Sequence, residues 1–72
     1  MIISIDYKTR RQMRSIVCES PKEMWRAIHK VLGKGHTVVE VNIYDGSQHH
    51  GSNHTYALGF TAQGEPILKK YE

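Results

Sequence analysis

Hydrophobic residues recur at the spacing of an α-helix in the segment that follows Ser20. The apolar residues of this stripe are Met24, Trp25, Ile28, Val31 and Leu32. Charged and polar residues fill the positions between them. The pattern therefore predicts one amphipathic helix over residues 21–32, with its apolar side turned towards a core. Trp25 is expected to pack in that core rather than to bind a ligand.

The residues at the two ends of this segment favour a helix start and a helix stop. Ser20 and Glu23 have the spacing of a capping box, in which each side chain bonds to the backbone N–H of the other residue. Pro21 falls at the first helical position, where the missing N–H of proline costs nothing. Gly33, followed closely by Gly35, is expected to end the helix, because glycine tolerates the left-handed conformation of a helix C-terminus.

Five other segments have the residue types or the alternation of β-strands. They are residues 2–7, 13–18, 36–44, 54–61 and 67–71. In the third of these segments, the alternation turns Val39, Val41 and Ile43 towards the helix. The same alternation turns Val38 towards the other side of the sheet.

These elements predict an α+β fold with two layers, one amphipathic helix packed on a mainly antiparallel sheet, in the order β-β-α-β-β-β. The chain has 72 residues, of which 39% are hydrophobic, so we expect a single small α+β domain over residues 1–72. A chain of this length buries only about 60% of its unfolded surface. A homodimer or a larger partner would therefore add to its stability.

The single cysteine, Cys18, indicates a reducing compartment, because small secreted domains usually carry several disulfides. It is expected to be a small buried hydrophobe rather than a nucleophile. The first residues lack the pattern of a signal peptide. No apolar run approaches the length of about 20 residues that crosses a bilayer. We therefore expect a cytoplasmic protein with no membrane contact.

Basic residues are concentrated in residues 1–34, which hold eight Lys and Arg against three acidic residues. Lys8, Arg10, Arg11 and Arg14 surround the first predicted hairpin loop. Lys22, Arg26 and Lys30 form a line along the polar side of the helix. These seven residues are candidates for binding nucleic acid or another acidic partner, with Tyr7 available to stack on a base. A solvated, charged surface explains the same pattern equally well.

Three of the five histidines lie close together at His49, His50 and His54, in a segment rich in turn-forming residues. Imidazole is a common metal ligand, so this loop is a candidate metal site. The spacing matches no known zinc pattern, and a polar hairpin loop with solvated histidines is the simpler expectation. Adventitious binding of zinc or nickel is compatible with it. We expect no cofactor.

The run Gly51-Ser52-Asn53-His54 is also a candidate catalytic element, with His54 as a general base. On Gly51, Ser52 and His54 it resembles the Gly-Ser-x-His-like element of the HicA family of small toxin ribonucleases, which implies ribonuclease activity. The likeness extends to the helix and strands around this run, about a third of the chain, and its motif is very short. The N-terminal hairpin and the lack of a closing helix depart from the family, so we do not assign the chain to it. No second catalytic group can be named, which favours a protein that is not an enzyme.

The function predicted from the sequence is a small non-enzymatic binding, adaptor or inhibitor-type module that docks onto a larger protein or nucleoprotein. The first alternative is a nucleic-acid-binding domain that uses the basic hairpin and the helix surface. The second is a small ribonuclease-like enzyme that uses a loop histidine.

Overall fold

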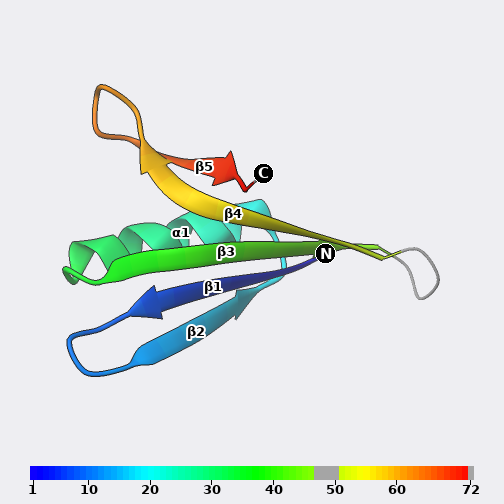
Figure 1. Ribbon diagram of the computed structural model, residues 1–72, viewed down its shortest axis with the longest axis horizontal. Helices are drawn as coiled ribbons and strands as arrows, with labels where there is room; N and C mark the ends of the chain where they lie inside the picture. Colours follow the sequence, from blue (N-terminus) through cyan, green and yellow to red (C-terminus); the bar gives the residue numbers. More distant parts are fainter. Residues whose placement is uncertain (47–50, 72) are drawn as a thin grey trace.

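The computed structural model describes residues 1–46 and 51–71 as one helix and five strands. The elements are β1 (Ile2–Lys8), β2 (Met13–Cys18), α1 (Pro21–Gly33), β3 (Thr37–Asp45), β4 (Ser52–Phe60) and β5 (Pro66–Lys70). All neighbouring strands are antiparallel, and the sheet has the order β2-β1-β3-β4-β5. This arrangement confirms the predicted α+β fold and its element order (Figure 1).

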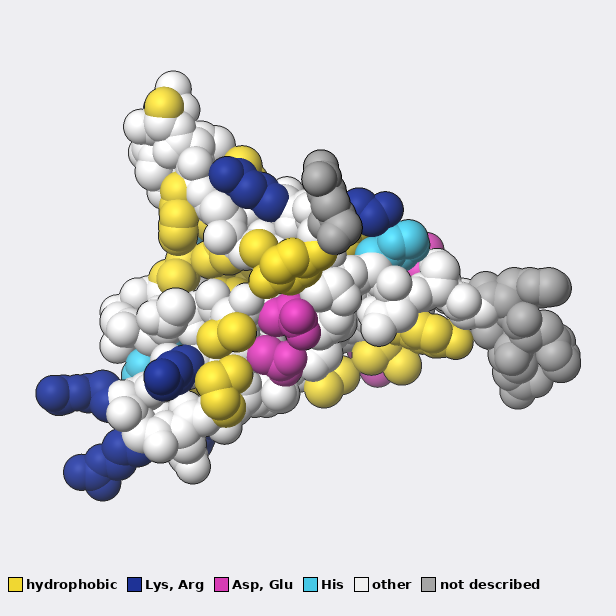
Figure 2. Space-filling view, in the orientation of Figure 1, with side chains coloured by type: hydrophobic (Ala, Val, Ile, Leu, Met, Phe, Trp, Pro, Cys, Tyr) yellow, Lys and Arg dark blue, Asp and Glu magenta, His cyan; other side chains and the backbone are white. Residues whose placement is uncertain are grey.

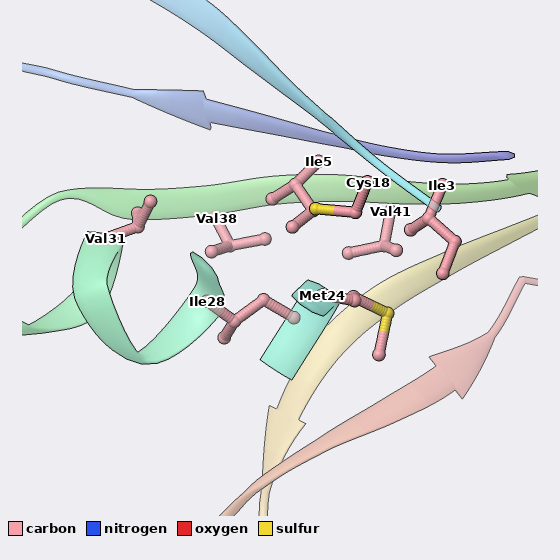
Figure 3. Close-up of a cluster of buried hydrophobic side chains, with 8 residues drawn as sticks. All are labelled: Ile3, Ile5, Cys18, Met24, Ile28, Val31, Val38 and Val41. Atoms are coloured by element: carbon pink, nitrogen blue, oxygen red, sulfur yellow. The ribbon is translucent and has the colours of Figure 1, made fainter. Parts of the chain in front are cut away.

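The two layers of the fold are α1 and the sheet, and their contact is formed mainly with β1, β2 and β3. Figure 3 shows that Met24, Ile28 and Val31 of α1 face side chains of the sheet. The buried residues are Ile3, Ile5, Cys18, Met24, Ile28, Val31, Val38 and Val41. Cys18 is therefore buried as predicted, and Trp25 packs partly buried against the same cluster.

The start of α1 has most of the predicted capping box. The side chain of Ser20 accepts a hydrogen bond from the N–H of Glu23 at 3.2 Å. The returning bond differs from the prediction, because the Glu23 carboxylate accepts from the N–H of Glu19 at 3.2 Å instead of from that of Ser20. Both bonds fasten the chain to the first turn of the helix.

The end of α1 corrects the predicted role of Gly33. Gly33 is the last helical residue, and the left-handed residue is Gly35, with a φ of +80°. The N–H of Gly35 donates to the Leu32 carbonyl at 2.9 Å, and that of His36 donates to the Val31 carbonyl at 3.2 Å. These two bonds are those of a Schellman motif, which needs a left-handed residue directly after the helix cap.

The sequence pattern was wrong about which valine of β3 enters the core. Val38 is buried, with 8% of its surface exposed, whereas Val39 is 43% exposed. Asp6 pairs with Glu40 while Tyr7 pairs with Val38, so Val39 is an extra residue on β3. This β-bulge shifts the alternation by one position.

The connection between β3 and β4 is shorter than the sequence suggested, because β3 extends to Asp45 and β4 begins at Ser52. His54 therefore lies within a strand.

No helix in the described part of the chain is long and apolar enough to cross a membrane.

Candidate nucleic-acid interface

An open cleft of about 740 Å³ lies between the β1–β2 hairpin and the C-terminal end of α1. The cations that line it are Arg10, Arg11, Arg14, Lys30 and Lys34. Its other lining residues are Tyr7, Thr9, Gln12, Ile16, Val31 and His36. The described residues of this lining include no acidic side chain. We refer to this feature as the basic cleft.

The hairpin wall of the basic cleft is shaped by Thr9. Its hydroxyl accepts from the N–H of Arg11 at 3.3 Å and from that of Gln12 at 3.2 Å. It also donates to the Gln12 carbonyl at 3.1 Å, and the N–H of Thr9 donates to the same carbonyl at 2.9 Å. A threonine that bonds to the backbone in this way fixes a tight turn. The turn presents Arg10 and Arg11 at the tip of the hairpin.

Arg14 is directed into the cleft by strand register and by Gln12. It pairs directly with Tyr7 across β1 and β2, so the two side chains leave the same face of the sheet. When the Gln12 amide is assigned so that its oxygen faces the guanidinium donors, this oxygen accepts from Arg14 Nη2 at 2.7 Å and from Nε at 2.8 Å. The guanidinium is thus held by two bonds while its remaining N–H donors stay available.

The helix wall of the basic cleft carries Lys30 and Lys34, which stand one turn apart at the end of α1. The carbonyl groups at a helix C-terminus carry a partial negative charge, which stabilises nearby cations. The Schellman motif then turns the chain so that His36 also enters the lining.

The floor of the basic cleft is aromatic and apolar. The rings of Tyr7 and His36 are stacked, with their centroids 5.9 Å apart and an angle of 22° between their planes. Ile16 and Val31 lie beside them in the lining. This floor connects the hairpin strand β1 to the residue that follows the helix end.

All five cations of the basic cleft are exposed to solvent. A single exposed ion pair contributes little, since water and salt screen it. Several cations around one concave site produce a summed positive potential that attracts a polyanion more strongly than any one of them. Figure 2 shows Lys and Arg side chains projecting from the hairpin end of the molecule, at the left of the view.

The structure brings together four of the seven basic residues selected from the sequence. Arg10, Arg11, Arg14 and Lys30 line the basic cleft, whereas Lys8, Lys22 and Arg26 do not. Lys8 follows Tyr7 on β1 and therefore points to the other face of the sheet. The remaining two lie in earlier turns of α1.

The sequence analysis missed Lys34 and His36 as site residues. Lys34 stands four residues after Lys30, which places the two on one side of a helix. His36 directly follows Gly35, and a glycine at the end of a helix reverses the chain direction. Both positions could be read from the sequence. That they lie beside the β1–β2 hairpin could not, because this depends on the tertiary fold.

The candidate metal and catalytic residues are only partly covered by the described residues. His49 and His50 lie outside them. His54 is half-buried on β4, opposite Ile43. Within residues 1–46 and 51–71, no group of three or more His, Cys, Asp or Glu is arranged to hold a metal ion. The metal prediction at these histidines stays a prediction.

Among residues 1–46 and 51–71, no side-chain hydrogen bond gives His54 a catalytic partner. The hydroxyl of Ser52 donates to the backbone carbonyl of Asp45 at 3.0 Å, so it is engaged with the backbone. Burial, with a further contribution from the Glu23 carboxylate, raises the pKa of the Cys18 thiol. Cys18 is therefore held as a neutral thiol inside the core and does not offer a nucleophile.

The face of the sheet away from α1, which we call the open face, has a different chemistry. Asp6 and Glu40 are direct partners across β1 and β3, and Figure 2 shows acidic side chains side by side on this face. Asp6 Oδ1 accepts from the Ser15 hydroxyl at 2.7 Å, and Glu40 Oε2 accepts from the Asn42 amide at 2.9 Å. Negative charge thus lies at the centre of the open face, and positive charge lies in the basic cleft.

The chain matches no protein-family model, no curated protein and no solved structure.

Proposed function

We propose that this chain is a non-catalytic module that binds nucleic acid through the basic cleft. The observation that carries the proposal is the convergence of five exposed cations, with no acidic side chain in the described lining, around one concave site. Lys and Arg neutralise phosphates and release their counterions, which supplies most of the affinity of sequence-independent binding.

The composition of the site suits phosphate in particular. Three of the five cations are arginines, whose planar guanidinium groups match phosphate oxygens with two parallel hydrogen bonds. The cations come from two walls that are far apart in sequence, so a chain of phosphates lying in the cleft contacts both. The function favoured by the sequence was docking onto a larger protein or nucleoprotein, and docking onto a nucleoprotein would use the same contacts.

The test is a titration of a fluorescein-labelled single-stranded oligonucleotide of about 16 nucleotides, followed by anisotropy. Salt is varied between about 50 and 200 mM, and the logarithm of the binding constant is expected to fall linearly with the logarithm of the salt concentration. Unchanged anisotropy at the lowest salt concentration would refute nucleic-acid binding.

A matched pair of variants separates the cleft from the net charge. The double variant Arg10→Gln/Arg11→Gln removes two cations from the cleft. The double variant Lys69→Gln/Lys70→Gln removes two cations from β5, at the opposite edge of the sheet from β2. We expect the first variant to lower the salt slope by about 1.4, since each phosphate contact on a single strand contributes about 0.7. Equal losses in the two variants would show that only net charge matters.

A further inference from the structure

Two aromatic rings lie among the cations of the basic cleft, and phosphate binding alone does not need them. Tyr7 and His36 are stacked with 5.9 Å between ring centroids, and both belong to the cleft lining. Ring surfaces of this kind bind planar groups, whereas phosphates are bound by charge and by N–H donors.

The backbone places the rings of Tyr7 and His36 in the basic cleft, and the sequence specifies the features that do so. Tyr7 points to the helix side of the sheet because it continues the alternation of Ile3 and Ile5 along β1. His36 reaches the same place because the left-handed Gly35 turns the chain back after α1. The stack therefore joins the two walls of the cleft, and a ligand that lies on it lies within reach of cations from both.

The size of the basic cleft restricts what it holds. Sites that bury small ligands have volumes of about 300 to 1,000 Å³, and the volume here is about 740 Å³. This space accommodates one or two nucleotides and is too small for a double helix. A base within a duplex is also already stacked on its neighbours, so its flat surface is not available to a side chain.

We propose that the basic cleft binds single-stranded nucleic acid, with an unpaired base against the Tyr7–His36 stack and the adjoining phosphates on the hairpin and helix cations. This inference rests on the proposed function and adds the class of nucleic acid to it. Every base has a π-surface, so binding of this kind tolerates any sequence. The partly buried neighbour Ile16 makes the floor suitable for a base and poor for a phosphate.

The experiment compares two single-stranded oligonucleotides of equal length and charge, one carrying thymine bases and one abasic. Wild-type protein is expected to bind the thymine oligonucleotide more tightly. Stacking on one base corresponds to a factor of between about 5 and 150 in affinity. Weaker binding of a duplex of the same length, competed against the labelled thymine oligonucleotide, is the second expected result.

Substitution of Tyr7 tests whether its aromatic ring causes the difference in affinity between the thymine and abasic oligonucleotides. Tyr7→Leu keeps an apolar side chain but removes the aromatic surface, so it should weaken binding of the thymine oligonucleotide and leave the abasic one unchanged. Tyr7→Phe keeps the ring and should preserve the wild-type preference. His36→Leu, which leaves β1 untouched, should also reduce the preference if Tyr7→Leu proves to be unfolded by circular dichroism.

The outcomes distinguish this inference from the proposed function. Equal affinity of the wild type for thymine and abasic oligonucleotides would overturn base stacking and leave phosphate binding in place. A preference for thymine that survives both Tyr7→Leu and His36→Leu would show that the base lies elsewhere. Failure of the wild type to bind either oligonucleotide would overturn the proposed function itself.

Discussion

The two faces of the sheet are built from alternate residues of the same strands, yet they have opposite properties. On the face covered by α1, Ile3 and Ile5 are completely buried, and the core they form contains no buried polar or charged residue in the described chain. On the open face, Ser4 and Asp6, which alternate with these isoleucines, take part in hydrogen bonds between side chains. The covered face therefore holds the fold together, whereas the open face carries polar side chains together with the exposed Val17.

The basic cleft lies at the border between these two environments. It forms where α1 ends and the covered face continues beyond it, so Ile16 is only partly buried beside the cations. A rigid core next to an incompletely covered edge positions exposed side chains without requiring them to be buried.

The largest expected effect is on the covered face. Ile28 is fully buried at the centre of the helix contact, so Ile28→Ala should lower the free energy of unfolding by about 2 to 5 kcal/mol. Val17 is 68% exposed on the open face, and Val17→Ala should change it by no more than about 0.5 kcal/mol. Urea denaturation followed by circular dichroism measures both.

The milder variant Ile28→Val covers the case in which Ile28→Ala does not fold. We expect it to cost about 0.5 to 1.5 kcal/mol. Destabilisation by Val17→Ala as large as that by Ile28→Val would show that Val17 is packed in the folded protein. That result would contradict the difference between the covered face and the open face.

The second expected effect is at the helix end. Replacing glycine by alanine should change the free energy of unfolding in opposite directions at Gly33 and Gly35. Nothing lies within 4 Å of a Cβ added at Gly33 or at Gly35, so only backbone conformation distinguishes them. Gly33→Ala should stabilise the helix by about 0.5 to 1 kcal/mol. Gly35→Ala should destabilise the protein by about 1 to 2 kcal/mol, since its φ of +80° is strained for alanine.

Thermal denaturation of the two glycine variants is the measurement. The same direction of change in both variants would contradict the Schellman motif. Gly35→Ala should also weaken oligonucleotide binding, because it displaces His36 from the lining of the basic cleft.

The third effect is on the open face, where two carboxylates face each other across β1 and β3. Like charges in direct cross-strand contact destabilise a sheet, so Glu40→Gln should raise the free energy of unfolding by about 0.2 to 1 kcal/mol. The glutamine oxygen can still accept from Asn42. Glu65→Gln, an exposed change in the turn before β5, is the control and should have no effect.

High salt should diminish the gain from Glu40→Gln, because it screens the repulsion. A loss of stability in Glu40→Gln would mean that the Glu40 carboxylate makes a favourable contact that outweighs its repulsion with Asp6.

The smallest expected effect is a pH dependence of the free energy of unfolding that comes from Cys18, in the core beneath α1. The pKa of Cys18 is raised by burial and, to a lesser extent, by Glu23. The unfolded chain therefore loses this proton at a lower pH than the folded protein does. The contribution of Cys18 to stability is fully present below about pH 8.5 and is lost as the pH rises above it.

Urea denaturation of the wild type and of Cys18→Ala, at pH values on both sides of about 8.5, isolates this contribution. Other groups titrate in both proteins, so only the difference between the two profiles reports on Cys18. Parallel profiles would contradict a buried thiol. A rapid reaction of the native thiol with iodoacetamide would contradict it as well.

Sequence patterns predicted the fold better than they predicted the site. The helix followed from its apolar stripe and its capping residues, since both signals are local. The bulge at Val39 did not, because Val38 and Val39 are both apolar and either one satisfies the alternation. Only the pairing of β3 with β1 decides between them.

The basic cleft was predictable in part, because its cations were visible but their arrangement was not. Arg14 and Lys30 line the same cleft because β2 lies beside β1 at the edge of the sheet and α1 ends next to the hairpin. Charge alone also selected Lys8, which strand alternation places on the other face. Applying that alternation at Tyr7 and Lys8 would have separated Lys8 from the residues of the basic cleft on the sequence alone.

The most direct test of the central claim maps where nucleic acid contacts the protein. The chain is small enough for resonance-by-resonance NMR, and a thymine oligonucleotide can be added stepwise to labelled protein. Binding at the basic cleft predicts that the amide signals of residues 9–14 and 30–36 shift, while those of β5 stay in place. Shifts centred on β5 or on the open face, or no shifts at low salt, would contradict it.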